Sequence, residues 1–246
     1  MSSLPPRNAI VTGASRGIGR AVALRLARDG FAAVVNYAGN RDKAAEVVNE
    51  ITGHGGRAVA VQGDVADPAD MARLFDEAEK AFGAVGAVVN SAGIMKLFPI
   101  ASGRVEDFDA VFAVNVRGTF NVLQQAAKRV ADGGRIITMS TSVLGMNFPN
   151  YGPYAASKAA VEVLTRILAH ELRGRGITVN AVAPGPTATE LFFEGKNEEQ
   201  IQRLAKLAAL ERLGEPDDIA NLVSFLAGPQ GGWINAQTVR ANGGYT

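Results

Sequence analysis

The stretch Ile10–Gly19, which reads IVTGASRGIG, joins a short apolar run directly to a helical pattern. Its glycines permit a tight turn, let the backbone approach a pyrophosphate, and allow the helix to pack closely on the strand. The free N–H groups and positive dipole end of that helix favour an anion. Although glycines also simply end strands, this placement predicts a dinucleotide-binding loop. Its expected contacts are Gly13, Ser15, Arg16, Gly17, Ile18 and Gly19.

Outward from this loop, short apolar runs alternate with amphipathic helical patterns. Most of the runs lack polar alternation, as expected for strands buried on both faces of a parallel sheet. The expected strands are Ala9–Val11, Ala32–Val35, Ala58–Gln62, Ala87–Asn90, Arg135–Met139, Thr178–Ala183 and Thr238–Arg240. The expected helices are Arg20–Arg28, Lys43–Thr52, Ala69–Phe82, Phe108–Ala131, Ala155–Arg173 and Asp217–Leu226. The pattern predicts an α/β fold, a Rossmann-type doubly wound parallel sheet of about seven strands with helices on both faces.

The composition is that of one globular domain spanning residues 1–246, with 47% hydrophobic and 20% charged residues and no linker-like stretch. The formal net charge is +1 and the two signs are interspersed, so we expect no nucleic-acid partner. The chain has no cysteine, which excludes disulfides, thiolate metal sites and a cysteine nucleophile. Two histidines, His54 and His170, are too few for a His-rich metal site.

The N-terminal stretch Met1–Arg7 lacks the long apolar segment of a signal peptide. No uninterrupted apolar run is long enough to span a bilayer. We therefore expect a cytoplasmic protein without membrane contact.

The loop spacing T-G-x-x-x-G-x-G differs from the G-x-G-x-x-G of most dinucleotide folds and resembles that of the short-chain dehydrogenase/reductase family. The resemblance runs from about Arg7 to the C-terminus. The further motifs that carry it, in order, are Asn90-Ser91-Ala92-Gly93, Asn115, Ser142, Tyr154-x-x-x-Lys158 and Pro184-Gly185. The C-terminal segments Asn235–Gln237 and Asn242–Gly244 look most like the 3-oxoacyl-thioester (acyl carrier protein) reductase-like and glucose dehydrogenase-like branches.

This resemblance implies an oxidoreductase that interconverts a ketone and a secondary alcohol by hydride transfer from a nicotinamide cofactor. It also implies a homotetramer, assembled through the helices Phe108–Ala131 and Ala155–Arg173 and the C-terminal segment. Small residues such as Ala155 and Ala159 permit close helix contacts between subunits, although they equally permit tight packing inside one subunit.

Tyr154 and Lys158 are four residues apart on a helical stretch, so they lie on one face. A nearby ammonium, together with the positive nicotinamide ring, favours phenolate and lowers the pKa of a tyrosine from its usual ~10. The resemblance implies that Tyr154 is the acid/base and that Lys158 lowers its pKa. A Tyr-x-x-x-Lys pair by itself is usually a solvated helix face, so the position downstream of Ser142 decides the prediction.

Three hydroxyls, those of Ser140, Thr141 and Ser142, compete to orient the substrate carbonyl. Ser142 is predicted because a glycine follows it by three residues, as in the family, although it precedes Tyr154 by 12 residues, one fewer than in many members. Asn115, a polar residue in an apolar helical stretch, is expected to hold a water that links the lysine to solvent. The simpler interpretation is a core asparagine satisfied by neighbouring backbone, and the two are compatible.

The cofactor preference depends on the end of the second strand. Tyr37 stands where NAD-preferring folds carry an acidic residue, and no carboxylate appears before Asp42. Arg16 offers a guanidinium to a 2′-phosphate, with Asn36 and Tyr37 beside it, unless Arg16 is only a solvated loop charge and Asn36 a turn former. This pattern favours NADP(H), and NAD(H) remains possible.

The resemblance implies further cofactor contacts along the chain. Asp64, with Val65, would contact the adenine, although Asp64 alternatively caps the next helix, a role for which Asp67 is better placed. The other expected contacts are Asn90, Ala92, Gly93, Tyr154, Lys158, Pro184, Gly185, Thr187 and Thr189.

The substrate pocket is expected to be apolar and aromatic. The segment from Thr187 to Leu213 breaks the strand–helix rhythm and is predicted to be an insertion with helical character that covers the substrate. The candidate pocket residues are Met95, Leu97, Phe98, Leu144, Asn147, Phe148, Tyr151, Leu191, Phe192 and Phe193. They suggest a medium-sized apolar or aromatic carbonyl, although several of the phenylalanines would equally cover the core or pack against another subunit. The alternatives are an NAD-linked dehydrogenase of a sugar or sterol-like alcohol and a non-catalytic dinucleotide-sensing protein.

Overall fold

Seven parallel strands form one sheet in the computed structural model, which describes residues 6–246. Most of the stretch Met1–Arg7, where no signal peptide is expected, lies outside the described residues. The strands lie in the order β3-β2-β1-β4-β5-β6-β7. Their bounds are β1 Asn8–Thr12, β2 Ala32–Tyr37, β3 Ala58–Gln62, β4 Val85–Asn90, β5 Val130–Met139, β6 Thr178–Pro184 and β7 Thr238–Ala241. The strands β1, β2 and β4 are buried along their whole length, because helices cover both faces of the sheet.

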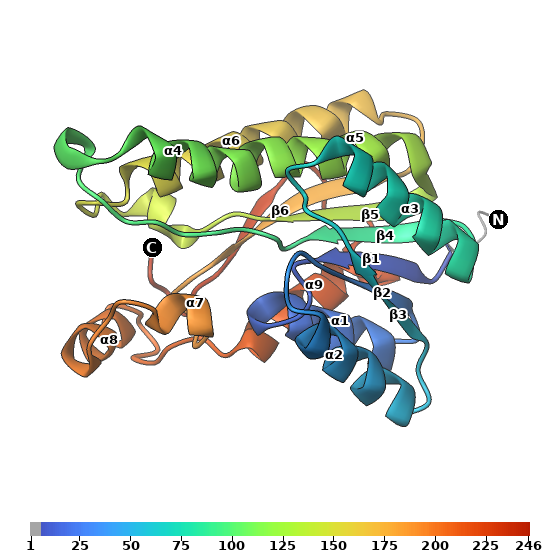
Figure 1. Ribbon diagram of the computed structural model, residues 1–246, viewed down its shortest axis with the longest axis horizontal. Helices are drawn as coiled ribbons and strands as arrows, with labels where there is room; N and C mark the ends of the chain where they lie inside the picture. The colour runs from blue at the N-terminus through green and yellow to red at the C-terminus, as the bar shows by residue number, and fades with distance from the viewer. Residues whose placement is uncertain (1–5) are drawn as a thin grey trace.

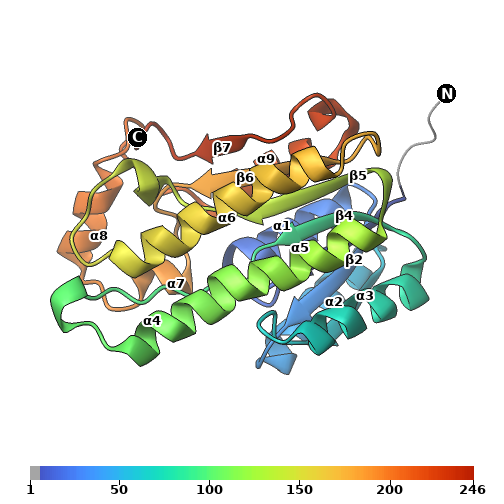
Figure 2. The ribbon, with the colours of Figure 1, turned by 90° about the horizontal axis from the view of Figure 1, so that it is seen from above.

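The helices form two layers, one on each face of the sheet (Figures 1 and 2). In Figure 1, α1, α2 and α9 lie below the sheet, and α3, α4, α5 and α6 lie above it. Each layer closes its own hydrophobic core against the strands. The helix bounds are α1 Gly17–Arg28, α2 Arg41–Gly53, α3 Pro68–Phe82, α4 Val105–Phe112, α5 Gly118–Arg129, α6 Gly152–Glu171, α7 Glu190–Phe193, α8 Glu198–Ala205 and α9 Pro216–Ala227. Short 3₁₀ turns span Ile100–Ser102, Ser142–Gly145 and Pro229–Gly231.

The predicted α/β class and doubly wound parallel sheet are confirmed. The single helix predicted over Phe108–Ala131 is wrong in two respects. A π-helical turn, Ala113–Arg117, separates α4 from α5, and the chain is already extended at Val130, where β5 begins. The turn lies against the loop after β3, where a Cβ on Gly118 would come within 2.6 Å of the Val65 side chain. Close packing of this kind is not visible in the apolar periodicity of the sequence.

Residues 187–213, hereafter the covering segment, leave and rejoin the sheet at one point. Thr187 and Gly214 form an isolated parallel bridge. The N–H of Ala188 donates to the Gly214 carbonyl, and the N–H of Gly214 donates to the Pro186 carbonyl, both at 2.8 Å. The segment between these anchors contains α7 and α8, in agreement with the helical character predicted for it.

In residues 6–246, none of the helices combines the length and the apolar character that a bilayer crossing requires.

Candidate active site

A cavity of about 620 Å³ opens at the carboxyl ends of the strands. The chain builds β1, β2 and β3 toward one side of the sheet and β4 onward toward the other, so the crevice lies at the point where the strand order reverses. All the residues predicted to contact a dinucleotide line this cavity except Asn90. They are Gly13, Ser15, Arg16, Gly17, Ile18, Gly19, Asn36, Tyr37, Asp64, Val65, Ala92, Gly93, Tyr154, Lys158, Pro184, Gly185, Thr187 and Thr189.

The glycine loop has the shape that a pyrophosphate requires. Gly13 has a φ of 62°, and a Cβ there would lie 2.8 Å from the Cα of Ala92. A Cβ on Gly19 would lie 2.3 Å from the Gly13 carbonyl oxygen, so α1 could not approach the loop this closely with any other residue. The N-cap residue of α1, Arg16, makes no side-chain hydrogen bond to the first turn, which leaves the N–H groups there open to an anion. The loop therefore fits a dinucleotide phosphate.

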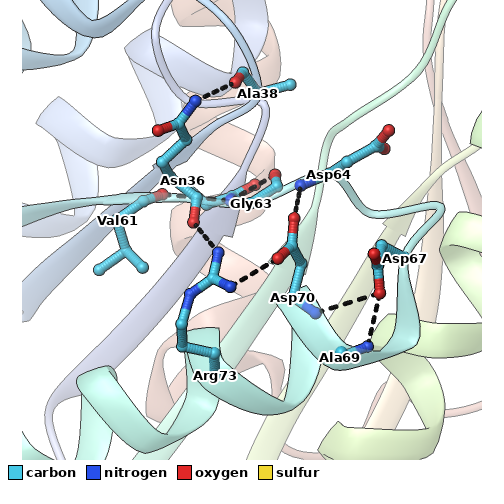
Figure 3. Close-up of polar contacts among 10 residues, drawn as sticks. Asn36, Ala38, Val61, Gly63, Asp64, Asp67, Ala69, Asp70 and Arg73 are labelled. Atoms are coloured by element: carbon cyan, nitrogen blue, oxygen red, sulfur yellow. Dashed lines mark hydrogen bonds and ion pairs between the residues drawn. The ribbon is translucent and has the colours of Figure 1, made fainter.

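The end of β2 presents no acidic side chain to the cavity. Tyr37, at the position where an Asp is expected in NAD-preferring folds, is buried and packs in the core beneath α1 and α2. Asn36 is buried as well, and its amide donates to the carbonyls of Val61 and Gly63 at 3.2 and 3.0 Å (Figure 3). The Asn36 amide N–H groups therefore fasten β2 to the end of β3 and are not free to bind a phosphate.

Asp64 and Asp67, at the end of β3, have separate roles. Asp67 caps α3, accepting from the N–H of Ala69 at 2.8 Å, as the sequence predicts. Asp64 is exposed, and in Figure 3 its carboxylate points away from the contacts around Asp70. One Asp64 oxygen accepts from the N–H of Ala66 at 2.9 Å, which holds the carboxylate at the rim of the cavity. This position suits a contact with an adenine amino group.

Two cations share one carboxylate at this end of the cavity. Glu190, the first residue of α7, lies 3.3 Å from Arg16 Nη1 through Oε2 and 2.6 Å from Lys43 Nζ through Oε1. Lys43 lines the cavity but is not among the residues predicted from the sequence. The sequence nevertheless holds a signal: Lys43 stands in the first turn of α2, where the helix dipole disfavours a cation, and an unfavourable charge of this kind indicates an anion site.

Tyr154 and Lys158 both line the cavity from α6. Lys158 Nζ donates to the Met139 carbonyl at 2.8 Å, and burial lowers the pKa of this lysine to about 8. Burial also raises the pKa of Tyr154 to about 12, while hydrogen bonding with the Thr141 hydroxyl lowers it and Tyr151 raises it. Here removal of solvent outweighs the nearby groups, whereas the lowering expected from the sequence also involves the positive nicotinamide ring. The phenol is therefore protonated at neutral pH and ready to donate a proton.

The three hydroxyls after β5 have different hydrogen-bond partners. Ser140 Oγ donates to Glu162 Oε1 at 2.6 Å. Ser142 Oγ donates to the Ala183 carbonyl at 2.9 Å and accepts from the Asn242 amide at 3.0 Å.

Ser142, predicted to orient a carbonyl, is buried and lies outside the cavity lining, because its hydroxyl ties the end of β5 to β6 and the C-terminal tail. Thr141 lines the cavity, and its Oγ1 accepts from the N–H of Val143 at 3.3 Å, so its proton is not used in that contact. Ser140 lines the cavity as well, but its proton is donated to Glu162, so Thr141 is the hydroxyl placed to donate toward Tyr154.

The chain as a whole is similar to known proteins. Residues 13–246 match the family model described as enoyl-(acyl carrier protein) reductase. A protein of Picea abies named short-chain type dehydrogenase/reductase is 50% identical, with 97% of this chain and 92% of the relative covered. The chain belongs to the short-chain dehydrogenase/reductase family.

Two further members of the short-chain dehydrogenase/reductase family carry cofactor names. The Arabidopsis thaliana NADPH-dependent aldehyde reductase-like protein, chloroplastic, is 48% identical over 98% of this chain and 95% of its own length. A short-chain dehydrogenase of Burkholderia cenocepacia, solved in complex with NADP, is 38% identical with a TM-score of 0.92, and 99% of each chain is covered.

Asn115 of this short-chain dehydrogenase/reductase is completely buried in the π-helical turn and does not line the cavity. Its amide donates to the Ile94 carbonyl at 2.9 Å and to Ser157 Oγ at 3.0 Å, and its Oδ1 accepts from the Ile94 N–H at 2.9 Å. The side chain thus connects the loop after β4 to the first turns of α6. Asn115 therefore agrees with the simpler interpretation, a core asparagine whose hydrogen-bonding groups are satisfied by its neighbours. Its bond to Ser157 also holds the helix that carries Tyr154 in place.

Asn90, also predicted to contact the cofactor, is buried behind the cavity wall. Its Oδ1 accepts from Thr12 Oγ1 and its amide donates to Thr119 Oγ1, both at 2.8 Å. Thr119 in turn donates to the Asn115 carbonyl at 2.6 Å. Asn90 therefore joins β1 to the first turn of α5, and both of its polar groups are occupied by protein.

The predicted substrate residues divide into two groups. Met95, Tyr151, Leu191 and Phe192 line the cavity. The others, which lie outside the lining, are Leu97, Phe98, Leu144, Asn147, Phe148 and Phe193.

Phe148 backs the cavity wall, with its ring 5.7 Å from that of Tyr151 and 6.4 Å from that of Tyr245. Tyr245, in the C-terminal tail, lines the cavity and is not predicted, because the tail follows the last strand without any periodic pattern.

Proposed function

We propose that this protein is an NADP(H)-dependent oxidoreductase that interconverts a carbonyl compound and an alcohol. One observation carries the proposal: a phenol, a buried amine and a hydroxyl that hydrogen-bonds with the phenol line the same cavity as a glycine loop shaped for a dinucleotide. The three groups are those of Tyr154, Lys158 and Thr141.

The chemistry divides between the cofactor and the chain. When bound, NADPH would supply the hydride that reduces the carbonyl carbon. Tyr154 donates its phenolic proton to the carbonyl oxygen, so the carbonyl becomes an alcohol, and takes a proton back in the reverse direction. Thr141 orients the same oxygen by a hydrogen bond and stabilises the negative charge that develops on it. Lys158 supplies a positive charge to the site as an ammonium. Burial lowers the pKa of this amine only to about 8, so the amine is mostly protonated at neutral pH.

The choice of NADP(H) over NAD(H) rests on charge. The end of β2 lacks the carboxylate that would repel a 2′-phosphate, and Arg16 and Lys43 stand beside it. The names of the Arabidopsis and Burkholderia relatives support the same cofactor. An NAD-linked dehydrogenase is the alternative, and initial rates with NADPH and NADH at matched concentration distinguish the two. A large preference for NADH would contradict the proposal.

The substrate class follows from the lining. Met95, Tyr151, Phe192 and Tyr245 surround the catalytic end with apolar and aromatic surface. We therefore propose a medium-sized apolar or aromatic aldehyde or ketone, and the aldehyde named in the Arabidopsis relative is consistent with this class. A 3-oxoacyl thioester is the second candidate, since the matched family model is described by an acyl-carrier-protein activity. Turnover of small charged keto acids alone would overturn both.

The decisive experiment replaces Tyr154 with Phe. Loss of the proton donor is expected to lower kcat for reduction of an aromatic aldehyde by about 10³-fold. NADPH binding, followed by the fluorescence of the nicotinamide, is expected to change by less than about twofold. The control is Tyr151→Phe, a neighbouring cavity tyrosine whose ring lies 6.4 Å from that of Tyr154. Wild-type turnover by Tyr154→Phe, or equal losses in both variants, would contradict the assignment.

Two further expectations concern the assembly and the location of the protein. A homotetramer is supported by exposed apolar residues on two separate parts of the surface. A cytoplasmic location is also proposed, and cell fractionation tests it.

A further inference from the structure

Glu190 is an acidic side chain that no step of the proposed reaction uses. It belongs to the covering segment, whereas its two partners, Arg16 and Lys43, belong to the phosphate loop and to α2. Each carboxylate oxygen of Glu190 contacts a different cation: Oε2 accepts from the Arg16 guanidinium and Oε1 accepts from the Lys43 ammonium. All three residues line the adenosine end of the cavity.

The two cations occupy unfavourable positions unless an anion is present. Arg16 occupies the N-cap position of α1 and Lys43 lies in the first turn of α2, so each stands at the positive end of a helix of at least 12 residues. The two helix ends and the two side chains together attract negative charge to one point. In this structure the carboxylate of Glu190 supplies the negative charge. The contacts with Lys43 and Arg16 hold the pKa of Glu190 below its usual range.

The contacts of Glu190 are of a kind that a ligand can replace. The side chains of Arg16, Lys43 and Glu190 are 59%, 38% and 57% exposed, and ion pairs this exposed to solvent are individually weak. A phosphate monoester carries up to twice the charge of a carboxylate and offers three acceptor oxygens. It therefore competes well for the same two cations.

We propose that Glu190 is an internal competitor of the cofactor's 2′-phosphate and a specificity-determining residue of the cofactor site. Its carboxylate holds the covering segment against Arg16 and Lys43 until a 2′-phosphate displaces it. An acidic residue fixed at the end of β2 would repel the phosphate permanently, whereas the half-exposed carboxylate of Glu190 comes from an insertion that leaves the sheet at Thr187 and rejoins it at Gly214. The inference rests on the proposed NADP(H) binding and does not depend on the carbonyl chemistry.

The test is cofactor binding by calorimetry, without any carbonyl substrate. Glu190→Gln keeps the size of the side chain and removes its charge, so it is expected to tighten NADP⁺ binding about 3- to 10-fold and to change NAD⁺ binding by less than about twofold. The same contrast is expected between 2′-AMP and 5′-AMP, which carry the phosphate at the two alternative positions. The control is Glu194→Gln, which removes the same charge from the covering segment at a residue outside the ion pairs found in residues 6–246. Equal effects on NADP⁺ and NAD⁺, or weaker NADP⁺ binding in Glu190→Gln, would overturn the proposal.

Two further measurements address the cations and the segment. Lys43→Gln is expected to weaken NADP⁺ about 10-fold and to leave NAD⁺ unchanged. Hydrogen exchange of residues 187–205, measured without cofactor, is expected to be faster in Glu190→Gln than in Glu194→Gln. Unaltered NADP⁺ binding in Lys43→Gln, or unaltered exchange in Glu190→Gln, would also overturn it. A protein that passes these tests and fails to reduce carbonyls would contradict the proposed reaction alone.

Discussion

At the scale of single residues, the direction of each O–H bond after β5 determines what the hydroxyl can do. Ser140 and Ser142 donate to Glu162 and to the Ala183 carbonyl, and Thr141 keeps its proton for the cavity. Thr141→Ala is therefore expected to lower kcat by about 10²-fold, the usual effect of removing one donor to a developing oxyanion. Steady-state rates with a saturating aldehyde measure this.

Two further variants serve as controls for Thr141→Ala. Thr141→Ser restores a donor and is expected to recover activity to within about 10-fold of wild type. Ser142→Ala removes a buried hydrogen bond and is expected to lower the free energy of unfolding by about 1 kcal/mol while kcat stays nearly unchanged. If Ser142→Ala is the inactive variant and Thr141→Ala the active one, the assignment from the motif is right and the one from hydrogen bonding is wrong.

Lys158 connects the site to stability through its pKa. Burial lowers this pKa from 10.5 to about 8, so between these values the unfolded chain binds a proton that the folded protein has lost. The free energy of unfolding of the wild type should therefore rise with pH across this window. Relative to Lys158→Met, which lacks the amine, the gain from pH 7 to pH 10 is expected to be about 2 kcal/mol.

Urea unfolding of both variants at several pH values measures the Lys158 effect. The titration of Tyr154 is common to both proteins, so it cancels in the difference. A difference that stays constant from pH 7 to pH 10 would mean that the amine titrates as it does in water.

The reacting residues show why sequence identifies some roles and not others. Tyr154 and Lys158 were predictable because helical spacing places them on one face of α6 and the family resemblance implies a role for that pair. The choice between Thr141 and Ser142 was not, since it depends on contacts with Ala183 and Asn242, which are distant in the chain. The pKa of Tyr154 depends on its burial as well as on neighbouring charges, and spacing reveals only the charges.

At the scale of elements, the parallel strands were the most predictable part of the fold. Apolar runs without alternation require burial on both faces, which only helices on both sides of the sheet provide. The segment Phe108–Ala131 was less predictable, because the apolar period continues through a π-helical turn that Asn115 and Thr119 stabilise by hydrogen bonds. Those bonds join three elements, so the sequence of one helix does not contain them.

The covering segment was also predictable only in part. Its place and helical content follow from the interrupted rhythm after Pro186, and its lining residues Leu191 and Phe192 follow from their apolar character. The contact of Glu190 with the phosphate loop joins residues more than 170 positions apart, and only the folded chain reveals it. Such a contact depends on how α7 packs against the start of α1 and not on the sequence of either element.

At the scale of the whole molecule, exposed apolar side chains lie on two separate surfaces. Phe120 on α5 and Val163 and Ile167 on α6 are each about half exposed, and these helices run side by side in Figure 2. Trp233, just before the edge strand β7, is 98% exposed. A tetramer with three twofold axes needs at least two different self-complementary surfaces, and this chain offers two candidates. Each large apolar side chain contributes about 1.5–3 kcal/mol when a second copy covers it.

These surfaces lead to a prediction about assembly. The wild type is expected to have four times the 25.7 kDa mass of one chain by light scattering. Ile167→Glu places a charge in the centre of the α5–α6 surface, where burial of an unpaired carboxylate is costly, so the variant is expected to have half the wild-type mass. Thr52→Glu adds the same charge to an exposed position of α2, away from both surfaces, and is expected to leave the mass unchanged. A monomeric wild type, or an Ile167→Glu variant with wild-type mass, would mean that α5 and α6 face solvent in the working protein.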